Sequence, residues 1–587
     1  MSQNKTEKVI QDWKVLKRVL TLSDPFKMLL WLCVLLGIFS AILASVRPWL
    51  TQLMVDNYIV HYDQVGLKRM AWIIGAVLIS EFGMTYLFSY YTSDLGQSVI
   101  KYLRVKVFNH AESMKLRFFD KTPIGIVTTR TINDVEAVSN IFSEGFITII
   151  SDLLTFVAVI GFMFYINWKL ALACIVTFPF IIWGTYLFKE AVKGSFNEVR
   201  EKVAQMNAFV QEHISGMRIV QIFNAQSREF EKFEQINDDH RQANLKSVWY
   251  FSIFFPIVEV ILSIAVAIML WYGAKLIMAP GSIVEVGIFI AFYQYLNLAF
   301  RPLRQLADKF NTLQMGIVAA DRVFKILDTD ERIENNGIYV PERVQGKIDF
   351  KDVWFSYNEK DYVLKGISFH AEPGQTIALV GATGSGKTST VNILNRFYEI
   401  QKGEILIDDI EIQKYELTAL RRSIGMVMQD VFLFSGSIMD NITLKNPDIS
   451  RDRVIEAAKI VGAHSFIMDM PGGYDYNVME RGATISAGQR QLISFIRALV
   501  YNPSILILDE ATSSIDTESE ILIQQAIEKL IKGRTSIIVA HRLSTIQNAD
   551  LIIVMEHGVI KEKGTHESLL ALEDGYYKKL VEMQFAH

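Results

Sequence analysis

The stretch that decides the fold reads Gly381-Ala382-Thr383-Gly384-Ser385-Gly386-Lys387-Thr388. It follows an apolar run over 376–380 and opens a polar, helix-compatible run from Ser389. This is the pattern G-x-x-x-x-G-K-[ST] between a strand and a helix, in which glycines let backbone N–H groups wrap an oligophosphate without obstruction by a Cβ atom. The helix that follows points its positive end at the same phosphates. We therefore predict a nucleotide-binding loop rather than a simple glycine-rich turn.

Individual side chains of this loop have separate expected tasks. Lys387 can reach the β and γ oxygens of the nucleotide, and the Thr388 hydroxyl can hold Mg²⁺. The residues expected to bind the phosphates are Gly381, Thr383, Gly384, Ser385, Gly386, Lys387, Thr388 and Ser389.

The composition places part of the chain in lipid. The chain has 587 residues, of which 51% are hydrophobic, and its mean hydropathy is +0.24. That length exceeds a single core and suggests about three domains. A net charge of −4 argues against a nucleic-acid partner. Cys33 and Cys174 both lie in apolar runs, so we expect two buried thiols rather than a disulfide framework.

Six apolar segments follow a polar N-terminus that does not resemble a cleaved signal peptide. Residues 5–22 mix basic and apolar residues at helical spacing, which predicts an amphipathic helix at the membrane surface, with an ordinary solvated helix as the alternative. The six segments are 28–46, 68–91, 145–167, 169–188, 247–274 and 283–300. The first is free of charge and long enough to cross a bilayer. The second, third and fifth carry Glu81, Asp152 and Glu259 respectively.

The loops between these segments are unequal. The loops at 92–144 and 189–246 are long and rich in Lys and Arg, whereas the others are short and poor in both. The positive-inside rule therefore predicts that both termini and both long loops are cytoplasmic. The long loops still have helical, amphipathic spacing, so we expect the spans to continue as helices below the membrane. Isolated helix pairs would be unstable, so their tips must pack on something.

The C-terminal part alternates short β-rich runs with helical ones, which predicts an α/β domain with a mainly parallel sheet. Examples of the β-rich runs are 347–350, 376–380, 404–407, 424–428, 504–508, 535–539 and 551–555. The run over 505–508 ends in Asp509 and Glu510. Because ligands bind at the carboxyl ends of such strands, Asp509 can complete a Mg²⁺ shell and Glu510 can act as general base on water. Two solvated acids are the alternative interpretation.

Two further polar residues follow predicted strands. Gln429 can ligate Mg²⁺ or hold water, and His541 can hydrogen-bond a γ-phosphate oxygen. The predicted catalytic residues are therefore Glu510, His541 and Gln429, and the predicted metal ligands are Thr388, Gln429 and Asp509. The fold class is an α-helical transmembrane domain, with six spans and long cytoplasmic helical extensions, fused to an α/β P-loop ATPase domain. We place the first domain at 1–325, a linker at 326–344 and the nucleotide-binding domain at 345–587.

Together these motifs resemble those of ATP-binding-cassette (ABC) exporters, and the whole chain resembles a half-transporter of that type. The matching stretches in the α/β part are 355–357, 381–388, 427–429, 485–489, 508–510, 514–516 and 540–542. The resemblance implies ATP and Mg²⁺ as cofactors, stacking of adenine on Tyr357 and a contact of Asp516 with a second ATPase. It also implies that Gln429 links the nucleotide to the membrane part and that His541 positions the γ-phosphate. The signature residues Ser486, Gly488 and Gln489 would meet the ATP held by the partner's P-loop.

The membrane part shows the same resemblance. Residues 117–125 with 133–135 are similar to the first cytoplasmic loop of these exporters, and residues 212–223 are similar to the second. The resemblance implies short coupling helices at both tips that dock on the ATPases. It also implies a multi-pass protein of the plasma membrane with a cytoplasmic ATPase domain, and recurrent Lys, Ile and Asn suggest a bacterial one.

The sequence departs from the family pattern at two glycines. The signature reads Ile-Ser-Ala-Gly-Gln, so Ala487 stands where the family has Gly, and an added methyl would crowd the approach to a γ-phosphate. Met479 also stands where the family commonly has Gly. We infer an asymmetric heterodimer with a second ABC half-transporter, in which one site hydrolyses ATP through Glu510 and the site completed by Ala487 is slow. A homodimer with two mildly altered sites is the alternative.

The expected function is export of amphipathic compounds, drugs or lipids, by alternating access. Spans rich in aromatic residues and Met would give adaptable walls. Glu81 and Glu259 are candidates for contact with cationic substrates, or else members of structural pairs. The alternatives are a homodimeric lipid or lipid-A-type flippase and, in a different class, an ATP-gated channel, although the long regulatory insertion expected of a channel is absent. The six spans exclude a soluble ATPase, and no nucleic-acid partner is expected.

Overall fold

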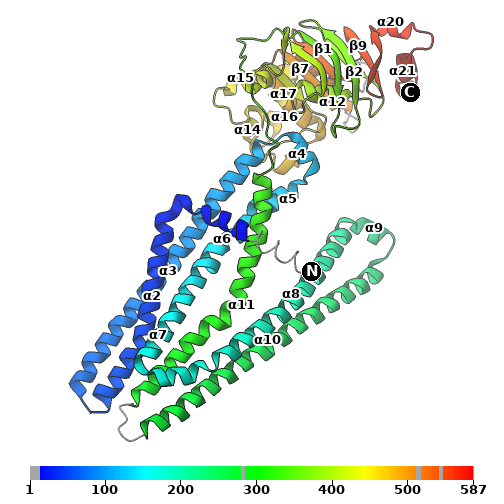
Figure 1. Ribbon diagram of the computed structural model, residues 1–587. Coiled ribbons are helices and arrows are strands. Elements are labelled where there is room, and N and C mark those ends of the chain that lie inside the picture. The colour runs from blue at the N-terminus through cyan, green and yellow to red at the C-terminus, as the bar shows by residue number, and fades with distance from the viewer. Residues whose placement is uncertain (1–12, 279–284, 510–516, 541–545, 586–587) are drawn as a thin grey trace. The chain divides into compact units, whose positions relative to one another are not determined.

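The computed structural model describes residues 13–278, 285–509, 517–540 and 546–585 (Figure 1). The chain divides into two compact units. The helical unit comprises Met1–Glu112 and Ile124–Asp330, and the α/β unit comprises Ser113–Pro123 and Glu331–His587. The short segment at 113–123 therefore packs with the α/β unit although it lies between two long helices of the helical unit.

Six long helices stand at the positions of the six apolar segments. They are α2 (Lys27–Leu53), α3 (Gln64–Glu112), α7 (Ile147–Ile175), α8 (Phe178–Ser215), α10 (Gln226–Ile277) and α11 (Gly287–Leu327). Among the described residues, four stretches are long and apolar enough to cross a membrane: Asp24–Ile59, Gln64–Glu112, Ile124–Ile175 and Gln226–Ile277. The apolar part of α8 is shorter and covers Phe178–Phe188. At a rise of about 1.5 Å per residue the longest helices far exceed a hydrocarbon core of about 30 Å, which confirms long helical extensions.

Smaller elements join these helices. They are η1 (Asp24–Phe26), η2 (Met54–Ile59), α5 (Ile124–Thr129), η3 (Arg130–Asp134), α6 (Val135–Asn140) and η4 (Ile141–Phe146). The predicted turn between the third and fourth spans is a break inside α7, where Asn167 has φ −155° and ψ 101°. Its Oδ1 accepts a hydrogen bond from the Leu170 N–H at 3.0 Å, which caps the next helical turn.

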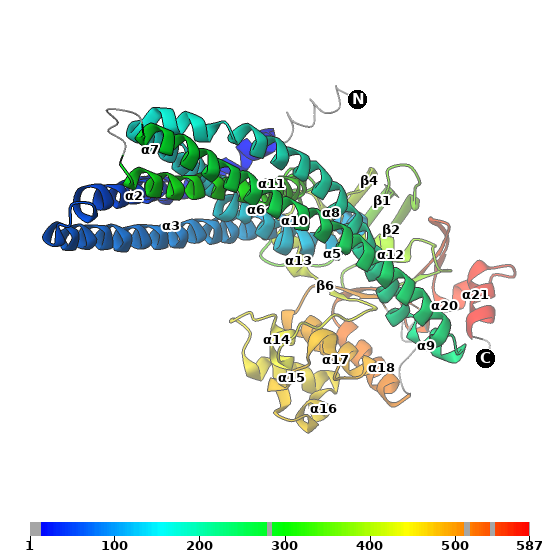
Figure 2. The same ribbon diagram turned by 90° about the horizontal axis from the view of Figure 1, so that it is seen from below.

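Helices α8 and α10 run side by side as one long hairpin in both views (Figures 1 and 2). Within it the rings of Phe188 and Phe254 stack with centroids 3.8 Å apart. The short helix α9 (Met217–Ile222) closes the hairpin at its far end. We name this end, from Ile214 to Phe223, the second tip.

One face of the predicted N-terminal amphipathic helix packs on protein over its described part. Residues 13–21 are helical, and Leu16, Val19 and Leu22 are buried in a cluster with side chains of α3, α6 and α11. Arg18 forms a bidentate ion pair with Asp328 at 2.6 Å. Side chains of α3, α6 and α11 therefore cover one face of this helix, and its position at a membrane surface stays a prediction.

The α/β unit contains two sheets. The larger has the order β10-β9-β3-β8-β7-β6, and all neighbours in it are parallel except β10 and β9. Its strands are β3 (Thr376–Val380), β6 (Ile424–Val427), β7 (Ile505–Asp509), β8 (Thr535–Val539), β9 (Leu551–Glu556) and β10 (Val559–Gly564). The smaller sheet is antiparallel, in the order β2-β1-β4-β5. Its strands are β1 (Ile348–Phe355), β2 (Leu364–Ala371), β4 (Lys402–Ile407) and β5 (Ile410–Glu411).

This unit also contains several α-helices. They are α4 (Leu116–Lys121), α12 (Lys387–Leu394), α13 (Leu417–Ser423), α14 (Ile438–Thr443), α15 (Arg451–Val461), α16 (His464–Asp469), α17 (Ala487–Tyr501), α18 (Thr517–Ile531), α20 (His566–Leu570) and α21 (Tyr576–Phe585). Alternate residues of β3 pack into two separate hydrophobic cores. Ala378 and Val380 join one, and Ile377 and Leu379 join the other. The sheet is thus buried on both faces, as parallel sheets are.

The prediction of a mainly parallel sheet is correct for five of the seven predicted runs and wrong for two. The runs at 347–350 and 404–407 belong to the antiparallel sheet instead. The difference was visible in the side chains: β3 is apolar throughout, whereas β1 alternates buried and exposed positions. A strand with one solvated face fits an antiparallel sheet. Strands β2, β5 and β10 were not among the β-rich runs named as examples from the sequence.

Candidate nucleotide-binding site

Four neighbouring strands end at one edge of the larger sheet. The paired residues at these ends are Leu379 with Val539, Asp509 with Val539, and Val427 with Leu508. The predicted phosphate loop follows β3 directly. Asp509 ends β7, and Gln429 follows β6 by two residues. The topology therefore brings together, beyond the carboxyl ends of parallel strands, segments that are far apart in the sequence, which is where α/β sheets bind ligands.

The phosphate loop needs glycine at two positions for steric reasons. Gly381 has φ +156°, and a Cβ there would lie 2.2 Å from the carbonyl oxygen of Met555. Gly386 has φ +106° and is the N-cap of α12, where a Cβ would lie 2.6 Å from Leu364 Cδ2. The loop is therefore held close against β2 and β9, and its backbone conformation excludes side chains at these points.

Two polar groups of the loop lack the partners that a phosphate would provide. The Ser385 hydroxyl is buried and has no hydrogen-bond partner among the described residues. Lys387 is buried and donates to the carbonyl oxygens of Gly381 at 2.7 Å and Ala382 at 3.1 Å. Burial lowers the pKa of Lys387, and the nearby Asp509 opposes that shift. An anion beside Lys387 would stabilise its charge, so the residues present fit a nucleotide phosphate.

Hard oxygen ligands lie beside this loop. Asp509 is buried, and burial raises its pKa while Lys387 acts against the rise. Thr388 and Gln429 are both exposed. A carboxylate, a hydroxyl and an amide oxygen are a donor set that suits Mg²⁺. Asp509, Thr388 and Gln429 would therefore hold this ion, which would neutralise phosphate charge when bound.

Tyr357 lies next to the helix that follows the loop. Its hydroxyl is 3.1 Å from Ser389 Oγ, and its ring meets that of Tyr398 edge-on at 4.9 Å. The ring is half-buried and packs also against Phe355. An aromatic face at this place can stack on a base, and adenine stacking remains the expectation for Tyr357.

The signature residues form the N-terminus of α17. Ser486 Oγ accepts from the Gln489 N–H at 3.2 Å, and Gln489 Oε1 accepts from the Ser486 N–H at 3.0 Å. This capping box was not predicted, although the spacing Ser-x-x-Gln signals it. Ala487 is exposed and helical, and Gly488 is buried. The methyl of Ala487 is therefore compatible with the helical backbone of this chain.

Met479 occupies a backbone conformation that favours glycine. Its φ is +58° and its ψ is −172°. That region is essentially restricted to glycine and costs a side-chain-bearing residue about 1–3 kcal/mol. The second departure from the family pattern thus has a physical cost that the sequence alone did not reveal.

Several predicted site residues lie outside the described residues. They are Glu510, Asp516 and His541. Strand β8 ends at Val539 and strand β7 at Asp509, so the chain reaches the same edge of the sheet just before each catalytic candidate. Their roles stay predictions.

The segment Ser113–Pro123, which we name the first tip, contacts the α/β unit close to Tyr357. Arg117 pairs with Glu359 at 2.6 Å, and the Tyr398 hydroxyl donates to Asp120 Oδ2 at 2.7 Å. Phe118 is buried. Glu359 and Tyr398 were not predicted, since nothing in their local pattern signals a contact with residues more than 200 positions earlier.

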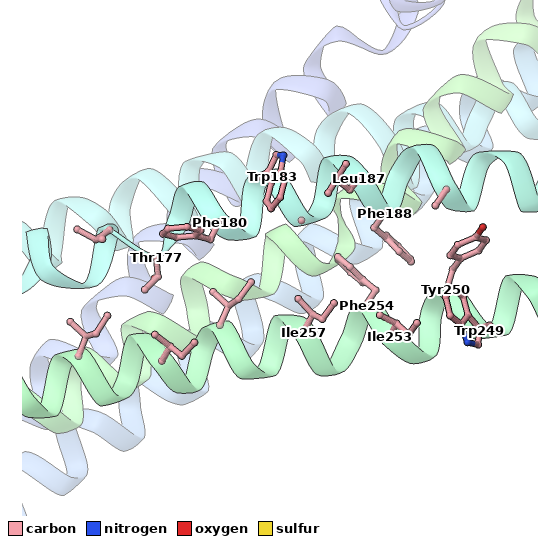
Figure 3. Close-up of a pocket in the computed structure, with 16 residues that line it drawn as sticks. Thr177, Phe180, Trp183, Leu187, Phe188, Trp249, Tyr250, Ile253, Phe254 and Ile257 are labelled. Carbon is pink, nitrogen blue, oxygen red and sulfur yellow. The ribbon is translucent and has the colours of Figure 1, made fainter.

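An apolar cavity of about 660 Å³ lies between α8 and α10 (Figure 3). Its walls include Phe180, Trp183, Phe188, Trp249 and Phe254, and none of the described lining residues is charged. Phe254 belongs to the predicted segment 247–274, one of the aromatic-rich spans expected to give adaptable walls.

The charged groups of the apolar segments are engaged within the chain. Glu81 forms an ion pair with Arg47 at 3.5 Å, which is the structural pair considered as the alternative to substrate contact. Asp152 forms an ion pair with Lys309. The role of Glu259 stays a prediction.

Comparison with known proteins agrees with this architecture. The family model of the ABC transporter transmembrane region matches residues 30–303, and that of the ABC transporter matches residues 364–513. The chain is similar to YknV of Bacillus subtilis, an uncharacterized ABC transporter ATP-binding protein, with 38% identity over 98% of this chain and 95% of the relative. It is also similar to the ATP-dependent lipid A-core flippase of Syntrophus aciditrophicus, with 34% identity over 98% of this chain and 95% of the relative.

Two further similarities are informative. The probable multidrug resistance ABC transporter ATP-binding/permease protein YheH of Bacillus subtilis is 36% identical over 92% of this chain and 80% of the relative. The solved structure of a bacterial Atm1-family ABC exporter with ATP bound superposes with a TM-score of 0.77 at 27% identity. That alignment covers 96% of this chain and 99% of the solved one.

Proposed function

This chain belongs to the ABC transporter family, and from that premise we propose that it exports amphipathic compounds as one half of a heterodimer. The family membership establishes the coarser statements: the protein is a bacterial-type membrane exporter, its α/β unit is cytoplasmic, and ATP hydrolysis drives its transport. The finer statements concern the substrate, the partner and the roles of single residues.

The cavity between α8 and α10 carries the substrate proposal. Its described walls are apolar and aromatic and bear no charge, so they suit the apolar part of a drug or lipid rather than a sugar, an ion or a peptide backbone (Figure 3). Two relatives are a probable multidrug resistance transporter and a lipid A-core flippase; lipid A and many drugs are amphipathic compounds. We extend that shared class, and not either substrate, to this chain.

Two exposed apolar surfaces support a dimer. On the second tip, Ile219, Ile222 and Phe223 are exposed. On the α/β unit, a receiving surface consists of Met428, Phe432, Phe434 and Met479, all more than half exposed. The segment that carries Met428, Phe432 and Phe434 lies next to the segment that carries Met479, since the Val478 N–H donates to the Gly436 carbonyl at 3.0 Å. Contiguous exposed apolar patches mark protein contacts, so we assign the second tip of each chain to the receiving surface of the other.

The asymmetry rests on the signature. In the proposed heterodimer, Lys387 and the loop N–H groups bind the phosphates, while Asp509, Thr388 and Gln429 hold Mg²⁺. Glu510 accepts a proton from the attacking water, and His541 positions the γ-phosphate. The partner supplies an intact signature to this site. Ala487 of this chain faces the ATP held by the partner and slows hydrolysis there.

A homodimeric lipid flippase is the second candidate. It is favoured by the helical, unstrained conformation of Ala487 at an exposed position, because a methyl that fits locally can also leave both sites active. The similarity to a lipid A-core flippase is compatible with this candidate.

The decisive experiment measures ATP hydrolysis by the purified chain alone in lipid, beside its Glu510→Gln variant. We expect little activity alone and activity on adding a second half-transporter, lost again with Glu510→Gln. Strong activity of the chain alone, abolished by the substitution, would establish a homodimer and remove the case for asymmetry.

The substrate class has its own test. Gly184 lines the cavity, and a side chain there would enter open space. Gly184→Phe should therefore fill the cavity and raise the concentration of amphipathic dye that half-stimulates hydrolysis by about tenfold or more, as expected when about 1.4 kcal/mol of binding is lost. Gly161→Phe is the matched control, since Gly161 also faces open space but lies outside the cavity. Equal responses of both variants would contradict the assignment.

A further inference from the structure

A second cavity, of about 490 Å³, lies in the α/β unit among residues that begin strands rather than end them. Three loops line it: 343–345 ahead of β1, 502–504 ahead of β7, and 532–534 ahead of β8. The amino ends of β7 and β8 are thus on the edge of the sheet opposite to the phosphate loop. The cavity is therefore separate from the nucleotide site.

Three cationic side chains line this cavity, and no Asp or Glu is among its described lining residues. Arg343 and Lys532 are exposed and make no hydrogen bond or ion pair within the described part of the chain. Arg534 donates to the Leu530 carbonyl at 2.7 Å and to Asn502 Oδ1 at 3.0 Å, which leaves further guanidinium N–H groups available. Burial lowers the pKa of Arg534, with no carboxylate offsetting this effect.

A structural explanation accounts for only part of this arrangement. Helices α17 and α18 both end at the cavity, and cations commonly cap such ends. Each helix end contributes about half a negative charge, so two ends offset roughly one of the three cations. The carboxylate of Asp408 accepts from the N–H groups of Gln345, Gly346 and Lys347 and is already satisfied. Arg534 is explained as a cap, whereas Arg343 and Lys532 are not.

We propose that this cavity binds a small multivalent anion of the phosphate class, held by Arg343, Lys532 and the free edge of Arg534. Guanidinium groups suit phosphate because their planar N–H groups donate in pairs. The Asn502 amide and the Ser504 hydroxyl add uncharged donors at the wall. The concave shape and volume suit a compact ligand rather than a flat protein surface.

An anion bound in this cavity would contact the segment ahead of β1 together with the segments ahead of β7 and β8. Strand β7 leads to Asp509, and strand β8 ends two residues before His541. Each spans about 17 Å for five residues. A bound anion would therefore fix the loop that follows α11 against the two strands that carry the proposed catalytic groups. The site itself stands independently of the transport proposal, because its test measures binding alone.

The test uses the full chain in lipid nanodiscs, carrying Lys387→Ala so that the phosphate loop does not compete. Isothermal titration with inorganic pyrophosphate should show one site per chain. Arg343→Ala with Lys532→Ala should weaken binding by about tenfold or more, because two charge-assisted contacts are lost. The control Lys459→Ala with Lys563→Ala removes the same charge at exposed positions outside the cavity and should change affinity by no more than about twofold.

Neither Arg343 nor Lys532 supports the fold through a described contact, so the cavity variant should keep the thermal midpoint of its parent. Absence of pyrophosphate binding in the parent, or equal loss in the cavity and control variants, would overturn the proposal. A hexaglutamate peptide that binds the cavity more tightly than pyrophosphate would also overturn it and indicate an acidic polypeptide as ligand.

Discussion

The two tips of the helical hairpins have similar secondary structure, but they differ in how far the described chain covers their side chains. Each contains a six-residue helix, α4 in the first tip and α9 in the second. In the first tip Phe118 is buried, and Arg117 and Asp120 both have partners in the α/β unit. In the second tip no residue of α9 is buried, and Phe223 is 77% exposed. The described residues of one chain therefore cover the apolar side chain of the first tip and leave the second tip exposed, which is the surface that the proposed dimer would cover.

The largest expected effect comes from placing a charge on the second tip. Phe223→Asp should lower substrate-stimulated ATP hydrolysis by tenfold or more. The proposed contact would bury an unpaired carboxylate in an apolar surface, which costs about 2 kcal/mol or more. The thermal midpoint of the isolated chain should not change, since Phe223 is exposed there. Ile521→Asp, at another exposed apolar position of the α/β unit, is the control. Full stimulation with Phe223→Asp would show that the second tip does not dock.

A smaller effect is expected at the first tip. Tyr398→Phe keeps the ring beside Tyr357 and removes only the hydrogen bond to Asp120. A half-exposed bond to a carboxylate contributes about 1 kcal/mol, so stimulation should fall roughly fivefold. Tyr501→Phe removes a comparable bond to the Thr443 carbonyl and serves as control. If both variants change the stimulation of ATP hydrolysis equally, the hydrogen bond at the first tip has no specific role in that stimulation.

The two tips should also differ in their response to pH. The hydrogen bond to Glu229 raises the pKa of His213, which lies beside the second tip, and hydrogen bonds from Lys232 and His213 lower the pKa of Glu229 to about 2. The His213 contribution is therefore complete below its unfolded pKa of about 6.5 and is lost as pH rises through the raised value. Hydrogen exchange at residues 212–229, corrected for intrinsic rates, should accelerate between mildly acidic and alkaline pH.

Exchange at residues 115–122 should not follow this titration, since the first tip contains no histidine. His213→Gln should make the second tip insensitive to pH over the same range. A titration that persists in this variant would assign the effect to another group.

The smallest effect concerns the receiving surface. Met479→Gly should relieve the strained backbone, offset in part by the greater freedom of glycine in the unfolded chain, and raise stability by about 1 kcal/mol or less. Arg481 also has a positive φ, of +55°, and Arg481→Gly is a useful comparison. A loss of stability in Met479→Gly, measured by chemical denaturation, would mean that the Met479 side chain contributes contacts that outweigh the strain.

The sequence predicted the elements of the nucleotide site better than their surroundings. Strands β3, β7 and β8 were placed within a residue or two, because fully apolar runs before Gly381 and Asp509 have few other interpretations. Three features were not predicted: the antiparallel sheet, the burial of Leu16 and Val19, and the hydrogen bond from Tyr398 to Asp120. These features depend on contacts between distant segments, and no local pattern specifies a distant partner.

The substrate cavity illustrates the same limit. Its residues come from two helices, and the aromatic pattern of each helix fits lipid contact equally well. Only the spacing of α8 and α10 distinguishes a wall of a cavity from an outward-facing ring. Conversely, the free-energy cost of a residue other than glycine at position 479 follows from its backbone conformation. The sequence suggested this cost only through the departure from a family glycine.

The placement of the first tip in the α/β unit has a consequence for biosynthesis. The ribosome completes Phe118 long before it reaches Glu359 and Tyr398, and at about 5–20 residues per second the interval is tens of seconds. During that interval the tip has helices on both sides but no surface to cover its apolar side chain. The later spans are therefore synthesised while the apolar side chain of this tip is uncovered, and the tip can dock only after the segment that contains Glu359 and Tyr398 has folded.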